Sequence, residues 1–128
     1  MTPANAKANA AVETAHGSEA LDAARCLAEN GFFRDAISRA YYAAYHWARA
    51  LLMTRGIEPK THRGTIQLFH LHFVKDGPLS ESDAAHLSHL ETYRELSDYT
   101  STAEFTEQQA RDEIGRAAQF IAACTPHL

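Results

Sequence analysis

Apolar residues recur at helical spacing along most of the chain, and no segment shows the two-residue alternation that is typical of a strand. The clearest case is the segment 32–55, which contains neither Gly nor Pro. Five of its apolar positions fall close together on one face of a helix: Ile37, Tyr41, Ala44, Ala48 and Leu51. The pattern predicts a helix from near Phe32 to about Arg55, which Gly56 ends and Pro59 prevents from resuming.

Four further helices are predicted, each bounded by residues that start or stop helices. They lie between Ser18 and Asn30, between Thr61 and Gly77, between Ser80 and Tyr99, and between Thr106 and Pro126. Residues 100–102 are expected to form a loop, and the short loop 56–60 favours antiparallel packing of the helices that it joins. The sequence thus predicts an all-α fold, an antiparallel up-and-down bundle of four to five helices.

The start of the chain differs in composition from the rest. Residues 1–17 are rich in Ala, include Pro3, and contain no large apolar residue except Val12. Such a segment offers little to a core, so we expect residues 1–17 to form a flexible N-terminal segment. Residues 18–128 are expected to form one helical-bundle domain, because a chain of this length suits a single core.

The overall composition is that of a soluble globular protein, with 45% hydrophobic and 22% charged residues. No segment approaches the roughly 18 apolar residues of a membrane span, and the N-terminus lacks the pattern of a secretory signal. Cys26 and Cys124 lie far apart within helical patterns, which favours free thiols over a disulfide. We therefore expect a cytoplasmic protein with no membrane partner.

A polar stripe lies opposite the apolar face of the helix 32–55. It consists of Arg39, Tyr42, His46 and Arg49. The segment 34–63 carries six basic and two acidic residues, a net charge of +4, whereas the whole chain has a net charge of −4. Because the local field near a site matters more than the total charge, this segment is a candidate surface for an anion. The alternative is an ordinary solvated basic face.

Several short sequence motifs follow one another along the chain. Arg39 and His46 have six residues between them, with Ala-Tyr-Tyr-Ala at 40–43 and Ala-Arg-Ala-Leu-Leu at 48–52. Pro-Lys-Thr-His at 59–62, Phe-Val-Lys at 73–75 and Arg94 with Asp98-Tyr99 follow. Over roughly residues 18–123 this set resembles the HEPN family of small helical domains, whose mark is an Arg and a His spaced along one helix. The resemblance implies a helical bundle, and it implies either ribonuclease activity or binding alone, because the family includes both.

The chemistry of Arg39 and His46 suits RNA cleavage without a metal. A His titrates near neutral pH and can serve as general base or acid, while an Arg presents a planar fork of donors to phosphate oxygens. We therefore predict that Arg39 and His46 are catalytic, or that they bind a nucleotide. In the alternative, His46 only forms a hydrogen bond at a helix interface and Arg39 pairs with a carboxylate.

No cofactor or metal is expected from the sequence. His86 and His89 share a helix face, but no third and fourth ligand has the matching spacing. A Gly-rich phosphate loop and the order of a Ser-His-Asp triad are also missing from the sequence, which argues against those enzyme classes.

Other residues are predicted to bind nucleic acid or a nucleotide: Tyr42, Arg49, Lys60, His62 and Arg63. The last three lie at the start of a predicted helix, where free N–H groups favour an anion, although a solvated turn is the alternative. Arg94 and Asp98 are spaced as a structural ion pair, and the resemblance implies that Tyr99 packs beside them.

The sequence departs from two patterns of the family. Many ribonuclease members have a polar residue directly after the Arg, where this chain has Ala40. Members that are switched by nucleotide transfer carry a Tyr two positions after the His, where this chain has Ala48. The resemblance implies two functions: the toxin-side component of a toxin–antitoxin pair, or a non-catalytic interaction module that binds or regulates a nucleotidyltransferase partner.

The helix 32–55 also predicts an assembly. A monomer would leave Tyr42 and Met53 in water along the side that carries the polar stripe. Pairing two copies of this helix across a two-fold axis would cover both residues and bring the two His46 side chains together. We therefore predict a homodimer; in the alternative, the polar stripe faces solvent in a monomer.

Overall fold

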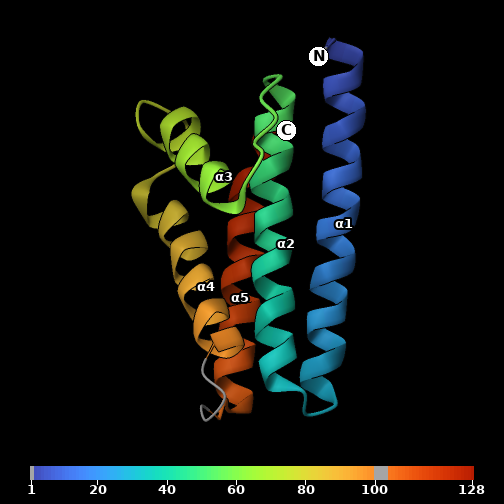
Figure 1. Ribbon diagram of the computed structural model, residues 1–128, viewed down its shortest axis with the longest axis vertical. Helices are drawn as coiled ribbons and strands as arrows, with labels where there is room; N and C mark the ends of the chain where they lie inside the picture. Colours follow the sequence, from blue (N-terminus) through green and yellow to red (C-terminus); the bar gives the residue numbers. More distant parts are fainter. Residues whose placement is uncertain (1, 100–103) are drawn as a thin grey trace.

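The computed structural model describes residues 2–99 and 104–128, and this part of the chain contains five α-helices and no strand (Figure 1). The helices are α1 (Pro3–Glu29), α2 (Phe33–Thr54), α3 (His62–Phe69), α4 (Glu81–Tyr99) and α5 (Glu107–Cys124). The four long helices run alternately down and up, and the short α3 lies obliquely across the top of α4 (Figure 1). The predicted all-α bundle is confirmed.

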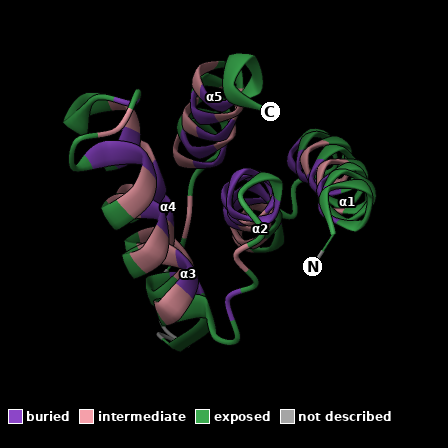
Figure 2. Cartoon of the chain, turned by 90° about the horizontal axis from the view of Figure 1, so that it is seen from above, coloured by how far each residue is buried: buried purple, intermediate pink, exposed green. Residues whose placement is uncertain are grey.

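Helix α2 occupies the centre of the bundle, with α1 on one side and α4 and α5 on the other (Figure 2). Six of its alanines are completely buried: Ala36, Ala40, Ala43, Ala44, Ala48 and Ala50. Small side chains on several faces let the neighbouring helices approach closely, while Tyr41, Leu51 and Leu52 fill the core. Only a narrow stripe of α2 reaches the surface, and it carries the predicted site.

Helix α1 begins at Pro3, so the predicted start at Ser18 is wrong. The side chain of Thr2 caps the helix by accepting a hydrogen bond of 3.1 Å from the backbone N–H of Asn5, and Pro3 suits the first turn. Alanine favours a helix, and the small residues Ala6, Ala10 and Gly17 are buried. Residues 3–17 thus form the first half of α1, and the division predicted at residue 17 falls inside this helix.

The packing of α1 also removes one of the two premises of the predicted dimer. Met53 is only 3% exposed, because it forms a small apolar cluster with Ala10 of α1 and Ala50 of α2. Trp47 is 8% exposed. Helix α1 therefore covers Met53, one of the two residues on which the dimer prediction rests, while Tyr42, the other, stays partly exposed.

Most helix ends lie where the sequence predicts them. Thr61 accepts from the N–H of Gly64 at 2.9 Å, and Ser80 accepts from the N–H of Asp83 at 3.0 Å. Thr106 and Gln109 form both halves of the predicted capping box. The predicted loop 100–102 falls outside the described residues.

The helix predicted between Thr61 and Gly77 is the exception. Helix α3 ends at Phe69, and a π-helical turn follows over His70–Val74, closed by a 2.9 Å bond from the N–H of Lys75 to the carbonyl of His70. The wider turn keeps Phe73 in the core, with its ring centroid 5.7 Å from that of Phe69. The chain is thus helical from His62 to Val74 within the predicted limits, but its winding changes from α to π after Phe69.

Both cysteines are free thiols: Cys26 is exposed and Cys124 is buried in the core. Across the described residues, none of the helices combines the length and the apolar character that a bilayer crossing requires.

Candidate functional site

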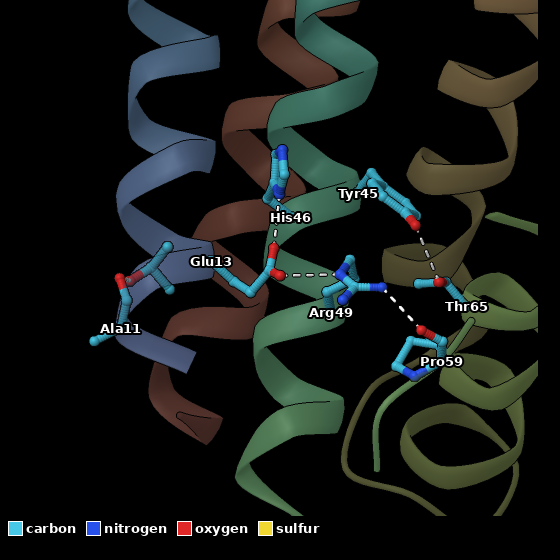
Figure 3. Close-up of polar contacts among 8 residues, drawn as sticks. Ala11, Glu13, Tyr45, His46, Arg49, Pro59 and Thr65 are labelled. Carbon is cyan, nitrogen blue, oxygen red and sulfur yellow. Dashed lines mark hydrogen bonds and ion pairs between the residues drawn. The ribbon is translucent and has the colours of Figure 1, made fainter. Parts of the chain in front are cut away.

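A carboxylate from α1 joins two polar side chains of α2 (Figure 3). One oxygen of Glu13 lies 2.7 Å from Nδ1 of His46, and the other accepts a 3.0 Å hydrogen bond from Nε of Arg49. Burial by itself raises the pKa of Glu13, but the hydrogen bonds and charges of His46 and Arg49 outweigh that effect and hold the pKa below its ordinary value. Glu13 is therefore ionised at neutral pH.

The ionised Glu13 fixes the tautomer of His46. A carboxylate can only accept hydrogen bonds, so the proton between the two groups belongs to Nδ1 of the imidazole. In the neutral ring Nε2 then carries a free lone pair, and this nitrogen points away from Glu13 (Figure 3). His46 lines a groove of about 320 Å³ between α1 and α2, together with His16, Glu19, Ala20, Ala23 and Arg39. The arrangement gives His46 the form that a general base needs.

The structure brings Arg39 to the same groove as His46. Arg39 is exposed, and its guanidinium lies 4.8 Å from the centroid of the Tyr42 ring. No carboxylate among the described residues forms an ion pair with Arg39. The sequence left open that His46 only forms a hydrogen bond at a helix interface and that Arg39 pairs with a carboxylate. His46 does form such a bond, to Glu13 of α1, whereas Arg39 lacks such a pair within the described residues. The charge of Arg39 is thus open to an anion.

Arg49, which the sequence predicts to bind nucleic acid, has two partners within the chain. Besides its bond to Glu13, it donates a 3.1 Å hydrogen bond to the carbonyl of Pro59 (Figure 3). Burial lowers the pKa of Arg49, but the hydrogen bonds and charges of Glu13 and Tyr45 together outweigh that effect and hold the pKa above its ordinary value, so the group stays charged. Its side chain is only 18% exposed. Its two hydrogen bonds connect α2 to α1 and to the loop before α3.

His62, at the start of α3, lies on a cluster of α2 aromatic rings. Its ring stacks on Tyr45, with centroids 4.2 Å apart and an interplanar angle of 9°, and its Nδ1 lies 3.3 Å from the hydroxyl of Tyr41. The ring of Tyr42 approaches it edge-on at 5.8 Å. Burial, followed by the positive charges of Arg94 and Arg49, lowers the pKa of His62, so the ring is neutral at pH 7. The structure therefore joins His62 to the stripe that carries Arg39 and His46.

The predicted ion pair of α4 is confirmed, with 3.0 Å between a guanidinium nitrogen of Arg94 and a carboxylate oxygen of Asp98. The guanidinium lies 4.9 Å from the Tyr41 ring and 6.0 Å from the Tyr42 ring. The expectation that Tyr99 packs beside the pair is wrong, since Tyr99 is 81% exposed at the last position of α4. The aromatic neighbours of Arg94 come from α2.

Lys60 and Arg63 are exposed on either side of the cap residue Thr61. Neither lines the groove that Arg39 and His46 share, so their contact with a phosphate stays a prediction.

Glu13 and His16 are the site residues that sequence reasoning missed. Both lie in the segment that was expected to be flexible, and the ring of His16 lies edge-on to that of His46, with centroids 5.5 Å apart. Their spacing of three residues on one helix face is the signal that could have found them. Tyr45 and Tyr41 also contribute, although the sequence assigned Tyr41 to the core alone.

Comparisons with known proteins agree on the family. A model of the HEPN domain matches residues 14–127. A protein named "Putative toxin" from Methanocaldococcus jannaschii is 42% identical over 103 residues, which cover 80% of this chain and 76% of the relative. A UPF0332 protein from Pyrococcus horikoshii is 49% identical over 71 residues, which cover 56% of this chain and 50% of the relative.

A solved structure shares the fold. The crystal structure of TT1696 from Thermus thermophilus matches with a TM-score of 0.81 and 18% identity, covering 94% of this chain and 98% of that one. At this level of identity the likeness concerns the arrangement of helices and carries no inference about activity.

Proposed function

This chain belongs to the HEPN domain family, and from that premise we propose that it is a metal-independent endoribonuclease, the toxin component of a toxin–antitoxin pair. The observation that carries the proposal is the 2.7 Å hydrogen bond between Glu13 and Nδ1 of His46, which leaves Nε2 as a base in the groove that Arg39 lines. Two of its relatives, both from Methanocaldococcus jannaschii, are named "Putative toxin", which supports the biological role.

In the proposed reaction, Nε2 of His46 takes the proton of an RNA 2′-hydroxyl. The 2′-oxygen attacks the neighbouring phosphorus, the bond from phosphorus to the 5′-oxygen breaks, and that oxygen takes a proton from water. Arg39 binds the phosphate oxygens, whose negative charge grows in the pentacoordinate transition state. The products are a 2′,3′-cyclic phosphate and a 5′-hydroxyl. His46 supplies the base and Arg39 the positive charge, the two roles that a metal ion fills in other nucleases.

The first test is RNA degradation in excess EDTA by the wild type and by His46→Ala. The wild type is expected to cleave and to leave 2′,3′-cyclic phosphate ends, and His46→Ala to be slower by about 10²-fold or more, the usual contribution of a general base. His86→Ala on α4 is the matched control and should cleave like the wild type. Activity lost on chelation and restored by magnesium, or an active His46→Ala, contradicts the proposal.

We expect RNA affinity to depend on the basic side chains near the groove. Arg39→Ala and Lys60→Ala should each weaken binding and lower the salt dependence by roughly 0.7 in slope for one lost phosphate contact. Arg49 is left out of this set because Glu13 and Pro59 hold its guanidinium. Arg111→Ala, an exposed residue of α5 paired with Glu107, is the control. Equal losses in the control and in Arg39→Ala would place the binding surface elsewhere.

The second candidate is a non-catalytic module that binds or regulates a nucleotidyltransferase. One observation favours it: Ala40, where many ribonuclease members are polar, is completely buried and offers Arg39 no polar neighbour. Ala48 is also completely buried, so the chain presents no acceptor for nucleotide transfer at that position. Under this candidate, His46→Ala leaves the binding of a co-purifying nucleotidyltransferase unchanged and no RNA is cleaved.

We also propose that the chain forms a homodimer. Burial of Met53 no longer supports this assembly, because α1 already covers that residue. The polar stripe around Arg39 and His46 is the face of α2 that a second copy can still reach. A dimer across this face would place two grooves side by side.

A further inference from the structure

His62 is held in one orientation by the three tyrosines of α2. Tyr45 covers one face of its ring at 4.2 Å, and Tyr42 meets it edge-on at 5.8 Å. The hydroxyl of the completely buried Tyr41 lies 3.3 Å from Nδ1. His62 is nonetheless exposed, so the part of the ring away from these contacts faces solvent.

The bond to Tyr41 determines which nitrogen of His62 carries the proton. Burial is the main cause that raises the pKa of Tyr41, so its hydroxyl keeps its proton. Among the described residues, the hydrogen-bond partner of this hydroxyl is Nδ1 of His62. Tyr41 therefore donates to Nδ1, and the neutral ring carries its proton on Nε2. His62 has the opposite tautomer to His46, whose proton lies on Nδ1.

The two histidines are connected through the aromatic rings of α2. The Tyr45 ring that His62 stacks on has its centroid 5.8 Å from that of His46, and the Tyr42 ring beside His62 carries the guanidinium of Arg39 at 4.8 Å. Nδ1 points to the buried hydroxyl, and the two ring nitrogens of an imidazole diverge. Nε2–H is therefore directed away from the core, on the α3 side of the stripe.

We infer that His62 is a phosphate-binding residue of the site, whose Nε2–H donates a hydrogen bond to a phosphate oxygen of single-stranded RNA that crosses the stripe from the groove of His46. This inference rests on the proposed RNA-cleaving function and gives it a second histidine within the same protomer. Burial, followed by the positive charges of Arg94 and Arg49, lowers the pKa of His62, so the neutral ring contributes a donor and not a charge.

A purely structural role would use only Nδ1, as the acceptor for the buried hydroxyl of Tyr41. The test must therefore isolate Nε2. His62→Phe keeps a ring to stack on Tyr45 but has no donor, whereas His62→Gln places an amide N–H near the position of Nε2. Matching unfolding temperatures for both variants will show that any difference in RNA binding comes from the donor.

The experiment measures binding of 2′-O-methylated single-stranded RNA, which cannot be cleaved at its blocked hydroxyls. His62→Phe is expected to bind about tenfold more weakly, the loss of one hydrogen bond to a charged group, and His62→Gln within about threefold of the wild type. The salt slope of His62→Phe should equal that of the wild type, because no charge is removed, while Arg39→Ala lowers it.

Imidazole ¹⁵N spectra of the wild type supply a readout that is independent of activity. They should show the proton of His62 on Nε2 and that of His46 on Nδ1, and the Nε2 signal of His62 should shift on addition of the methylated RNA. A proton on Nδ1 of His62, wild-type binding by His62→Phe, or equal losses in His62→Gln and His62→Phe would each overturn the inference.

The two proposals fail in different ways. If the wild type binds the methylated RNA and the Nε2 signal shifts but natural RNA stays intact, His62 keeps its role and the nuclease proposal fails. If natural RNA is cleaved and the Nε2 signal does not move, the role of His62 fails alone. A protein that neither binds nor cleaves RNA refutes both.

Discussion

Replacing Glu13 by Gln is expected to lower the rate of RNA cleavage by about a hundredfold or more while the fold stays intact. The carboxylate accepts the Nδ1–H of His46 at 2.7 Å, and this bond leaves the lone pair on Nε2. The amide of Gln can donate to Nδ1 instead, which moves the proton of the neutral ring to Nε2 and removes the base. Glu and Gln side chains have nearly the same shape, so a loss of cleavage rate would come from the changed tautomer of His46.

Single-turnover cleavage is the measurement, with two comparisons. Glu29→Gln changes an exposed carboxylate at the last position of α1, outside the groove, and should cleave like the wild type. Glu13→Ala removes the acceptor without offering a donor, so its loss should be smaller than that of Glu13→Gln. A Glu13→Gln variant as active as the wild type means that His46 does not work through Nε2.

The same carboxylate gives a dependence on pH. The pKa of Glu13 is lower in the folded chain than its ordinary value of 4.5, so the stability that Glu13 contributes is present above that value. This contribution is lost as the pH falls below 4.5 and through the lower folded pKa, where the carboxylate takes a proton. Denaturation followed against pH should show a steeper acid loss in the wild type than in Glu13→Gln.

The sequence predicted the parts of this molecule that depend on local pattern. The face of α2 that carries Tyr41 and Leu51 follows from spacing, and the cap at Thr106 follows from hydrogen-bonding chemistry that involves only a few neighbouring residues. Arg39 and His46 share a groove because two turns of one helix place them on one side.

What the sequence did not predict depends on contacts between distant segments. The first half of α1 has no large apolar side chain except Val12, so it has no hydrophobic stripe, yet Ala10 packs on α2 because small residues let two helices approach closely. Glu13 belongs to the site because that packing places it against His46, a contact that the sequence alone does not indicate. The prediction that Tyr99 packs beside Arg94 fails for the same reason, because the aromatic ring that contacts Arg94 is that of Tyr41 on another helix.

Gly17 is the point at which the packing of α1 on α2 is least tolerant, and Gly17→Val is expected to destabilise the fold by about 3 kcal/mol. A Cβ at this position would lie 2.7 Å from Cε3 of Trp47 and 3.1 Å from the carbonyl oxygen of Ala43. The indole cannot easily move aside, because it is 8% exposed and its Nε1 donates to the hydroxyl of Thr125 at 3.3 Å.

A single substitution made at two glycines separates this contact from helix propensity. Gly→Ala in a helix gains up to about 1 kcal/mol where there is room, and a Cβ added to Gly115 of α5 would meet no atom within 4 Å apart from its chain neighbours and the nearby backbone of its own helix. Gly115→Ala should therefore stabilise the chain. At Gly17 the overlap with Trp47 costs roughly 1–3 kcal/mol, more than the gain, so Gly17→Ala should destabilise it. Unfolding in urea measures both free energies.

The position of Gly17 also links this packing to the chemistry. It lies one helical turn from Glu13 on α1, so a side chain that pushes α1 away from Trp47 also lengthens the 2.7 Å bond between Glu13 and His46. Gly17→Ala should therefore cleave RNA more slowly than its folded fraction explains, while Gly115→Ala cleaves like the wild type. If Gly17→Ala is instead as stable and as active as Gly115→Ala, α1 does not pack on α2 at Trp47, and Glu13 is not held where it can orient His46.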